Sequence, residues 1–161
     1  MISRRVKRSR RGDFELRLPR EEREILRSIG PELRELLTEE AANVQPGEDP
    51  ALDRLFPVAY PTDDDRQTEY RLLVHDELLS SHLGALTVLE ETADAERLDE
   101  NQLLAWMRAL NDVRLVIGTR LEVTEERDER PKDRRDPRAA AFAVYDYLTY
   151  LQGEIIEALS G

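Results

Sequence analysis

Apolar residues recur every three or four positions along most of the chain, which is the spacing of one helix face. This spacing predicts four main helices, over residues 19–42, 62–91, 100–121 and 139–159. A short fifth helix should follow Asp49, which can cap its N-terminus, with Pro50 in the first helical position. The pattern therefore predicts an all-α bundle in which residues 1–161 form a single domain.

The first eighteen residues follow a different period. Phe14, Leu16 and Leu18 alternate with charged residues, which is typical of a half-buried β-strand. Gly12 precedes them and supplies the freedom that a tight turn needs. We therefore expect a short N-terminal β-hairpin over residues 1–18, packed on the helical bundle.

Three local signals set the limits of the helices. Asp99 is positioned to cap the helix that begins at residue 100. Gly30-Pro31 lies inside the first helical pattern and predicts a kink or two abutting helices, because proline removes a backbone hydrogen bond. Thirteen of the seventeen residues in 122–138 are charged, which predicts an exposed, mobile loop.

The composition narrows the class of protein. With 161 residues, 40% of them hydrophobic, the chain can bury one core of its own. It contains no cysteine, which excludes disulfides, thiolate catalysis and cysteine-ligated zinc within these residues. No apolar run reaches the roughly 18 residues of a membrane helix, and the basic N-terminus lacks the apolar centre of a signal peptide. We expect a cytoplasmic protein that does not contact a membrane.

Charge is distributed unevenly along the chain. The net charge is −11, yet the first twelve residues carry +6 and no acid, which leaves −17 for the remainder. This basic arm could contact DNA or an acidic partner, or it could fold onto its own acidic body, which is the interpretation we favour. The pattern shows no helix-turn-helix around the arm. The cations of the arm are Arg4, Arg5, Lys7, Arg8, Arg10 and Arg11.

One helical stripe contains a charge where only core is expected. Arg114 interrupts an apolar face of the helix over 100–121, whose other members are Leu103, Met107, Leu110, Ile117 and Leu121. Either a carboxylate from another element holds the guanidinium, or the stripe borders a cleft or a partner protein. We expect the former, with Glu69 or Glu77 of the preceding helix as the partner. The predicted structural polar network comprises Asn111, Asp112, Arg114, Arg120 and Glu69.

Aromatic residues lie on several faces of the last predicted helix. Phe142 and Tyr145 share one face, whereas Tyr147 and Tyr150 lie on neighbouring faces. A distribution this wide indicates that more than one face is covered. Packing in the chain's own core is favoured, and a homodimer contact or another partner contact through Tyr147 and Tyr150 is the alternative.

Candidate catalytic groups are few. Glu90, Glu91 and Asp94 have a spacing that resembles the acidic motif of all-helical nucleotide pyrophosphatases, but no matching acidic pair follows in the next helix. His75 and His82 are seven residues apart and lack an obvious third metal ligand. We expect no enzymatic activity, no cofactor and no metal site, and a metal-dependent nucleotide hydrolase remains the alternative.

A run of three acids, Asp63, Asp64 and Asp65, suggests magnesium. Its place in the first turn of a predicted helix is explained more simply by capping and by the helix dipole. The chain also lacks a glycine-rich phosphate loop, a nucleophile elbow and a Ser-His-Asp arrangement.

An ordered series of segments resembles an actinobacterial domain-of-unknown-function family that includes the AosR-type oxidative-stress regulators. The resemblance covers nearly the whole chain, and its central Leu-Asn-Asp-x-Arg segment is the most specific part. The genes of this family often stand beside the gene for the protease adaptor ClpS. The segments are Arg11-Gly12 with Phe14, residues 22–27, Asp49-Pro50-Ala51-Leu52, Arg54-Leu55-Phe56-Pro57, Ala59-Tyr60, Glu69-Tyr70-Arg71, Trp106, Leu110-Asn111-Asp112, Arg114-Leu115, residues 117–121, Tyr145, Leu148 and Leu151-Gln152.

The resemblance implies a regulator that acts through protein contacts, with an extracytoplasmic-function sigma factor as its partner and promoter regulation as the outcome. It also implies redox sensing through a Cys-x-x-x-Cys pair, which this chain cannot perform because it has no cysteine. RNA polymerase is a further possible partner. The association with ClpS supports a second interpretation, an accessory factor in regulated proteolysis that contacts a ClpS-type adaptor.

Overall fold

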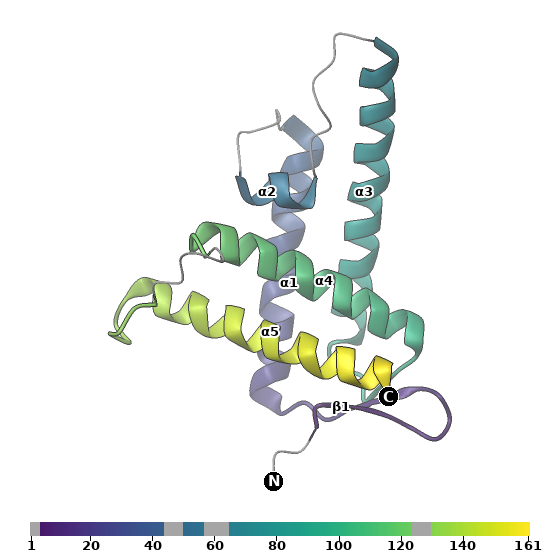
Figure 1. Cartoon of the computed structure of the whole chain (residues 1–161), viewed down its shortest axis with the longest axis vertical. Helices are drawn as coiled ribbons and strands as arrows, with labels where there is room; N and C mark the ends of the chain where they lie inside the picture. Colours follow the sequence, from purple (N-terminus) through teal and green to yellow (C-terminus); the bar gives the residue numbers. More distant parts are fainter. Residues whose placement is uncertain (1–3, 44–49, 57–64, 124–129) are drawn as a thin grey trace.

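A computed structural model describes residues 4–43, 50–56, 65–123 and 130–161, and these contain five helices and a small antiparallel sheet (Figure 1). The predicted all-α class with an N-terminal hairpin is confirmed. In Figure 1, α4 and α5 run antiparallel across α1 and α3, and the hairpin lies at the end of the molecule that holds the C-terminus. The elements are β1 (Val6–Arg8), β2 (Phe14–Leu16), α1 (Arg20–Asn43), α2 (Pro50–Leu55), α3 (Asp65–Thr92), β3 (Arg97–Leu98), α4 (Glu100–Arg120) and α5 (Pro137–Ser160).

The hairpin forms where the alternation predicted it, and it gains a third strand that the pattern did not show. β1 pairs with β2, and β2 pairs with β3 with Phe14 opposite Leu98. Gly12 has a φ of 92° in the turn, a left-handed conformation that favours glycine. Phe14 and Leu98 are both fully buried, so the sheet closes one end of the core. β3 has two residues, which is too short for a periodic signal.

α1 is one continuous helix, so of the two alternatives predicted at Gly30-Pro31, a kink or two abutting helices, the division into two helices is wrong. Leu26 and Ile29 before the proline and Leu33 after it are buried, and their burial holds both halves on the same core. Pro31 itself is exposed. Burial of the apolar stripe therefore outweighs the hydrogen bond that the proline removes.

The starts of α4 and α5 are both set by aspartate caps. Asp99 accepts from the backbone N–H of Gln102 at 2.7 Å, and the Gln102 side chain accepts from the Asp99 backbone at 2.9 Å, which completes a capping box. Asp136 caps α5 with Pro137 in the first position, two residues before the predicted start. The predicted caps and acids at Asp49, Asp63 and Asp64 lie outside the described residues, as do 124–129 of the charged loop.

The core is centred on α4, which packs against α2, α3 and α5. Trp106 is fully buried there, and its indole N–H donates to Thr92 Oγ1 at 2.6 Å. Within the described part of the chain, no helix has the length and apolar character needed to cross a bilayer. The largest fully buried side chains are Trp106, Phe14, Leu26, Leu37, Leu86, Leu89, Leu98, Leu103, Leu110, Leu148, Leu151 and Ile155.

Candidate interaction surface at the basic hairpin

The basic arm is anchored to the body through Arg5. Its backbone N–H donates to Glu154 Oε1 of α5 at 2.9 Å, and its Nε donates to Glu22 Oε2 of α1 at 2.9 Å. The Arg5 and Glu22 side chains are partly buried, with exposed fractions of 24% and 14%. A partly buried ion pair is less screened by solvent than a surface pair, so it can fix the orientation of the hairpin.

Arg8 ties the hairpin to the C-terminal end of α5. Its guanidinium donates to the carbonyl oxygens of Ala158 at 3.4 Å and Leu159 at 3.1 Å, and it also lies 4.9 Å from the centre of the Phe14 ring. α5 has no basic residue in its own last turn. Arg8 therefore supplies the positive charge that a helix C-terminus favours.

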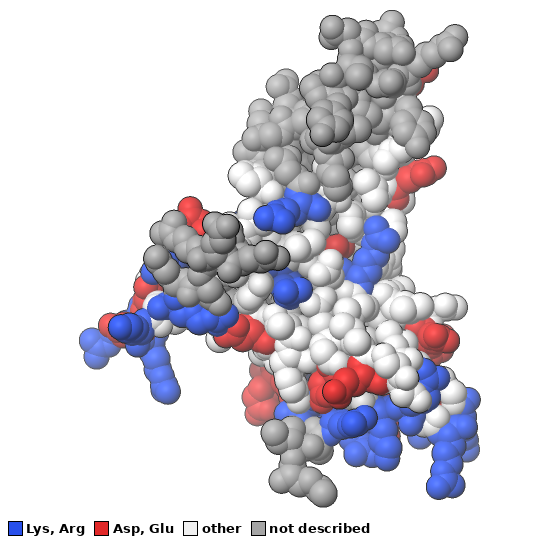
Figure 2. Space-filling model, viewed as in Figure 1, with Lys and Arg blue, Asp and Glu red and all other residues white. Residues whose placement is uncertain are grey.

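The four remaining cations of the arm, Arg4, Lys7, Arg10 and Arg11, are exposed. The described residues offer no carboxylate in ion-pair contact with them. Figure 2 shows a cluster of basic side chains at the end of the molecule where Figure 1 places the hairpin. The favoured prediction that the arm folds onto its own body therefore holds for Arg5 and Arg8, whereas these four cations face solvent.

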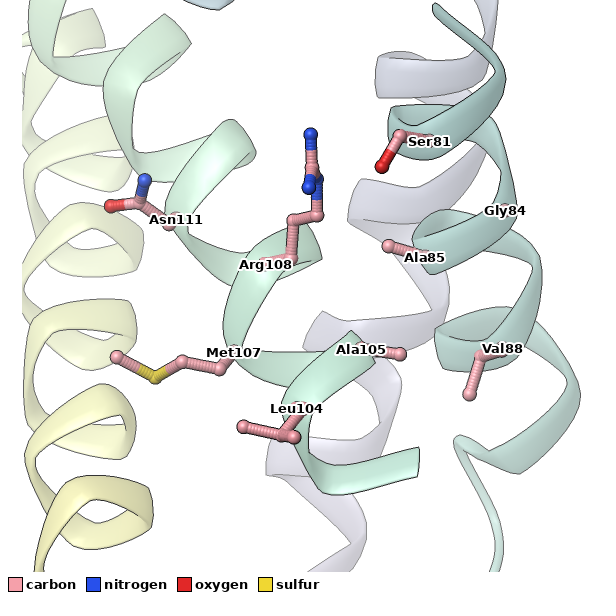
Figure 3. A pocket seen from close by; sticks show the side chains of 9 residues that line it. All are labelled: Ser81, Gly84, Ala85, Val88, Leu104, Ala105, Met107, Arg108 and Asn111. Carbon is pink, nitrogen blue, oxygen red and sulfur yellow. The ribbon is translucent and has the colours of Figure 1, made fainter. Parts of the chain in front are cut away.

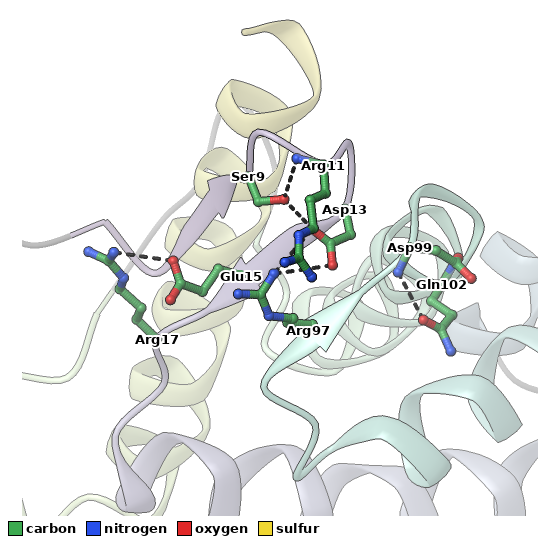
Figure 4. A network of polar contacts seen from close by, with 8 residues as sticks. All are labelled: Ser9, Arg11, Asp13, Glu15, Arg17, Arg97, Asp99 and Gln102. Atoms are coloured by element: carbon green, nitrogen blue, oxygen red, sulfur yellow. Dashed lines mark hydrogen bonds and ion pairs between the residues drawn. The ribbon is translucent and has the colours of Figure 1, made fainter.

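A polar network stabilises the turn that carries Arg10 and Arg11 (Figure 4). Ser9 Oγ donates to Asp13, and Arg97 of β3 approaches the same carboxylate at 3.4 Å. The Ser9 hydroxyl, and after it the Arg97 guanidinium, hold the pKa of Asp13 below its usual value. These contacts fix the turn and keep the exposed cations on a defined scaffold.

Tyr147 and Tyr150 of α5 lie beside the anchor of the hairpin. The Tyr150 hydroxyl donates to Glu154 Oε1 at 3.2 Å, the oxygen that also accepts from Arg5, and Tyr150 is 41% exposed. Burial, and after it the neighbouring Glu22 carboxylate, raises the pKa of Tyr147. Tyr147 is thus part of the packing between α5 and α1, whereas Tyr150 is accessible. We call Arg4, Lys7, Arg10, Arg11 and Tyr150 the hairpin surface.

Asp112 and Arg114, two charged residues of α4, contact different helices. Asp112 is 3% exposed and its Oδ2 lies 2.6 Å from His82 Nδ1 of α3. The other ring nitrogen, His82 Nε2, lies 3.0 Å from the Leu55 carbonyl oxygen of α2. The pair therefore joins three helices in the interior of the bundle.

Arg114 turns toward α5, so the prediction of a carboxylate partner, Glu69 or Glu77, is wrong. Its Nε donates to Thr149 Oγ1 at 3.0 Å and its NH1 donates to Gln152 Oε1 at 3.2 Å. Its guanidinium carbon lies 5.5 Å from the centre of the Tyr145 ring, a cation–π contact. Neutral hydrogen-bond acceptors suffice for the Arg114 guanidinium because this side of α4 remains partly hydrated.

The other members of the predicted polar network lie apart. Glu69 and Glu77 are exposed on α3. Asn111 lines a groove between α3 and α4, and Arg120 lines a hollow between α1 and α4. Asp112 and Arg114 thus have structural partners as expected, but the five residues do not share one cluster of contacts.

Residues 3–159 match the family described as "Domain of unknown function (DUF2017)". The chain belongs to the DUF2017 family. The resemblance on which the sequence analysis relied is thereby confirmed over nearly all of the chain.

Relatives of this DUF2017 chain carry a functional name. It is 32% identical over 152 residues to the oxidative stress regulator AosR of Mycobacterium tuberculosis, an alignment that covers 83% of this chain and 69% of that protein. The protein of Mycobacterium leprae that carries the AosR name is 34% identical over 137 residues, covering 74% of this chain and 62% of that protein. The chain thus spans about two thirds of the length of these relatives. No solved structure matches it.

Among the acids and histidines considered for catalysis, Glu90, Asp94, His75 and His82 have structural contacts in this DUF2017 fold, whereas Glu91 is exposed. Glu90 pairs with Arg34, and Asp94 pairs with Arg27, both across to α1. His75 stacks on the Phe56 ring with the ring centres 4.7 Å apart. Among the described residues, no group of three or more potential ligands is placed to hold a metal ion.

The role of His82 was not predicted from the sequence. His82 occupies an inward position of the α3 stripe together with Leu78, Leu86 and Leu89, and this register was the available signal that it is buried. An isolated histidine on an apolar stripe requires a polar partner. The buried Asp112 on the next helix is that partner.

Proposed function

We propose that this DUF2017 protein is a non-enzymatic regulator of a stress response that acts through protein contacts, with an extracytoplasmic-function sigma factor in the cytoplasm as its partner. Its relationship to proteins named oxidative stress regulator carries the proposal. The hairpin surface supplies a site for such a contact, because it presents exposed cations and one exposed aromatic ring on a fixed scaffold.

An acidic protein surface fits the hairpin better than DNA does. Outside its first twelve residues the chain carries a net charge of −17, which repels a phosphate backbone. Arg5 and Arg8 are engaged within the molecule, so at most four cations of the arm remain for phosphates. A partner that offers carboxylates and an apolar groove for Tyr150 matches both features of the surface.

The means of regulation differs from a thiol switch. No thiol is available within these 161 residues. We infer that the association itself is regulated, through the amount of this protein or through changes in the partner. Capture of the sigma factor should therefore persist in the presence of reductant and of peroxide.

An affinity capture from extracts of the source organism tests this function. The whole chain should recover a sigma factor or RNA polymerase, and the triple reversal Lys7→Glu, Arg10→Glu, Arg11→Glu should reduce recovery at least about fivefold, since several interfacial charges are reversed. A matched control reverses one lysine and two arginines that are also exposed, Lys132, Arg134 and Arg135. Recovery by this control should equal that of the unmodified chain.

Other results would contradict the proposal. Recovery of a ClpS-type adaptor without a sigma factor would assign the protein to regulated proteolysis. Equal loss of capture in the hairpin reversal and in its control would show that the hairpin surface has no specific role. Measurable nucleotide hydrolysis with added divalent metal would refute a non-enzymatic function.

A gel-shift series distinguishes protein contact from DNA contact. With four or fewer phosphate contacts, any DNA affinity should be weak and should fall steeply between low and moderate salt. Tight binding that is insensitive to salt would contradict the charge argument and would require a base-reading element elsewhere in the chain.

A further inference from the structure

A second surface lies away from the hairpin, between α3 and α4. An open groove of about 800 Å³ runs along the exposed side of the contact between these two helices, and Figure 3 shows that its lining side chains come from both. The α3 side is formed by small or short residues, whereas the α4 side carries Leu104, Met107 and Arg108. The lining residues are Ser81, Gly84, Ala85, Val88, Leu104, Ala105, Met107, Arg108 and Asn111.

Most of the residues that line the groove are apolar, and the groove is exposed. Leu104 is 48% exposed, although a leucine of a helical core is normally covered. Gly84 has no atom within 4 Å of the position that a Cβ would take, so the wall on this side is open. Figure 2 shows a broad uncharged area at the centre of the face that carries α3, α4 and α5.

The antiparallel register of α4 and α5 extends this apolar area. Arg114 contacts Thr149, so a residue two turns earlier on α4 lies level with one two turns later on α5. These positions are Met107 and Ile156, and Ile156 is 51% exposed. This register places the exposed Ile156 of α5 level with Met107 at the edge of the groove.

A single positive charge marks the groove. Arg108 is exposed, and its guanidinium projects along the space between α4 and α3 in Figure 3. Nothing in the described part of the chain forms an ion pair with it. A ligand in the groove would therefore bring apolar side chains for Leu104 and Met107 and a carboxylate for Arg108.

We propose that the α3–α4 groove binds an amphipathic helix of a partner protein that carries one acidic residue on its apolar face. From Ser81 to Val88 the α3 wall rises about 10 Å, the length of two helical turns. Such a wall accommodates apolar anchors at positions i, i+4 and i+7. Gly84, Ala85 and Ala105 leave room for the backbone of the bound helix.

A second copy of this chain fits the groove less well. In a twofold contact the same surface meets itself, which would bring Arg108 of each copy to one interface. Like charges at an interface are unfavourable, and two concave surfaces do not fill each other. The proposal concerns a surface separate from the hairpin, so it stands whether or not a sigma factor is the partner.

Fluorescence anisotropy with a designed probe tests the groove. The probe is a labelled helical peptide of about sixteen residues with leucines at i, i+4 and i+7 and one glutamate aligned with Arg108. The whole chain should bind it with a micromolar dissociation constant. Leu104→Asn should weaken binding about tenfold, since it removes a buried apolar contact.

A charge exchange identifies the role of Arg108. Arg108→Glu should weaken binding of the glutamate peptide about threefold to tenfold and should improve binding of the same peptide with lysine at that position. The matched controls are Leu73→Asn, which changes a leucine that is 63% exposed on α3, and Arg134→Glu, which reverses an exposed cation. Both controls should bind the glutamate peptide as the unmodified chain does.

The inference would be overturned by no binding of the peptide, by equal weakening by Leu104→Asn and Leu73→Asn, or by self-association of the free chain that Leu104→Asn abolishes. The last result would assign the groove to a second copy. If a variant fails to fold, the peptide can be added to the unmodified chain and the binding site located by NMR. The chemical-shift changes that the peptide causes must then concentrate on residues 81–88 and 104–111. Shifts confined to the hairpin would refute the groove. Failure to capture a sigma factor would leave these peptide results unaffected, so the two proposals can fail separately.

Discussion

Two charged residues of α4, separated by a single position, have opposite surroundings. Asp112 is 3% exposed and is paired with a buried histidine, whereas Arg114 is half-buried and is held by two neutral oxygens and an aromatic ring. The interior position requires a complete set of partners because water cannot replace any of them. Arg114 lies where α4 packs against α5, a contact that we call the α4–α5 seam. This position tolerates an incomplete set of hydrogen-bond partners because water reaches it.

The buried pair also links α2 to the bundle. His82 Nε2 faces the Leu55 carbonyl oxygen, which only accepts, so Nε2 carries a hydrogen. His82 Nδ1 and Asp112 Oδ2 are 2.6 Å apart, which is hydrogen-bond distance. A single imidazole thereby connects α2, α3 and α4, and the loss of either partner leaves a polar group stranded in the core.

Removing one member of the buried pair should have the largest effect on stability. We expect His82→Ala and Asp112→Ala each to lower the free energy of unfolding by about 3–5 kcal/mol, because the remaining group stays buried without its partner. The double variant should lose less than the sum of the two single losses. Urea unfolding measures all three values.

The ion pair between Arg130 and Asp146 provides the control for that experiment. These side chains are 40% and 53% exposed, so Asp146→Ala should change the free energy of unfolding by less than about 1 kcal/mol. If Asp112→Ala cost no more than Asp146→Ala, the distinction between the interior pair and exposed charges would be lost.

The sequence pattern predicts which residues of α4 are polar and structural, but not the direction in which each points. Asp112 and Arg114 are two residues apart and therefore lie on different faces of the helix. Which neighbour covers each face depends on how α3 and α5 pack, which is tertiary information. The prediction for Arg114 failed because it chose a partner by charge, whereas a half-hydrated guanidinium is satisfied by hydroxyl and amide oxygens.

Helix boundaries show a similar division between local and tertiary information. Asp136-Pro137 is the same start signal as Asp49-Pro50, and reading it in the same way would have placed the start of α5 at Pro137. The pattern predicted one helix over 19–42 but left open whether Pro31 divides it, because the outcome depends on burial of the apolar stripe on both sides of the proline. β3 exists only because it pairs with β2.

The α4–α5 seam can be loosened sterically at Gly118. A Cβ there would lie 3.0 Å from Tyr145 Cε2, the ring that Arg114 contacts. Replacing a helical glycine by alanine usually stabilises by up to about 1 kcal/mol. We expect Gly118→Ala instead to be destabilising by about 1 kcal/mol, because the ring and its contact with Arg114 must shift.

Gly153 of α5 is the matched control, since a Cβ there would meet nothing within 4 Å. Thermal unfolding should show Gly153→Ala stabilised and Gly118→Ala destabilised relative to the unmodified chain. Removing the ring by Tyr145→Ala should abolish the penalty of Gly118→Ala. Equal effects of the two alanines would mean that Tyr145 moves freely and that the seam is not tightly packed.

Arg114 itself should contribute less than the buried pair. Arg114→Met removes two hydrogen bonds and leaves the amide oxygen of Gln152, a residue that is 5% exposed, without its donor. The expected loss is about 1 kcal/mol, since water reaches part of this site. Arg108→Met on the exposed side of α4 should change stability by less than about 0.5 kcal/mol. A loss of 3 kcal/mol or more for Arg114→Met would place Arg114 in the same class as Asp112.

Tyr147 carries a buried phenol that stays neutral in the fold, and it should affect the free energy of unfolding only at alkaline pH. Burial and the neighbouring Glu22 carboxylate raise the pKa of Tyr147 above its ordinary value of 10.0. Well below pH 10 the phenol is protonated in both folded and unfolded chains, so it gives no pH dependence there. Above pH 10 the unfolded chain loses this proton first, and the free energy of unfolding should therefore fall as the pH rises. In Tyr147→Phe this component of the fall should be absent, which urea unfolding at a series of alkaline pH values measures. Identical pH profiles for the two chains would show that the phenol ionises as readily in the fold as in solvent, and that burial and the Glu22 carboxylate do not hold it neutral.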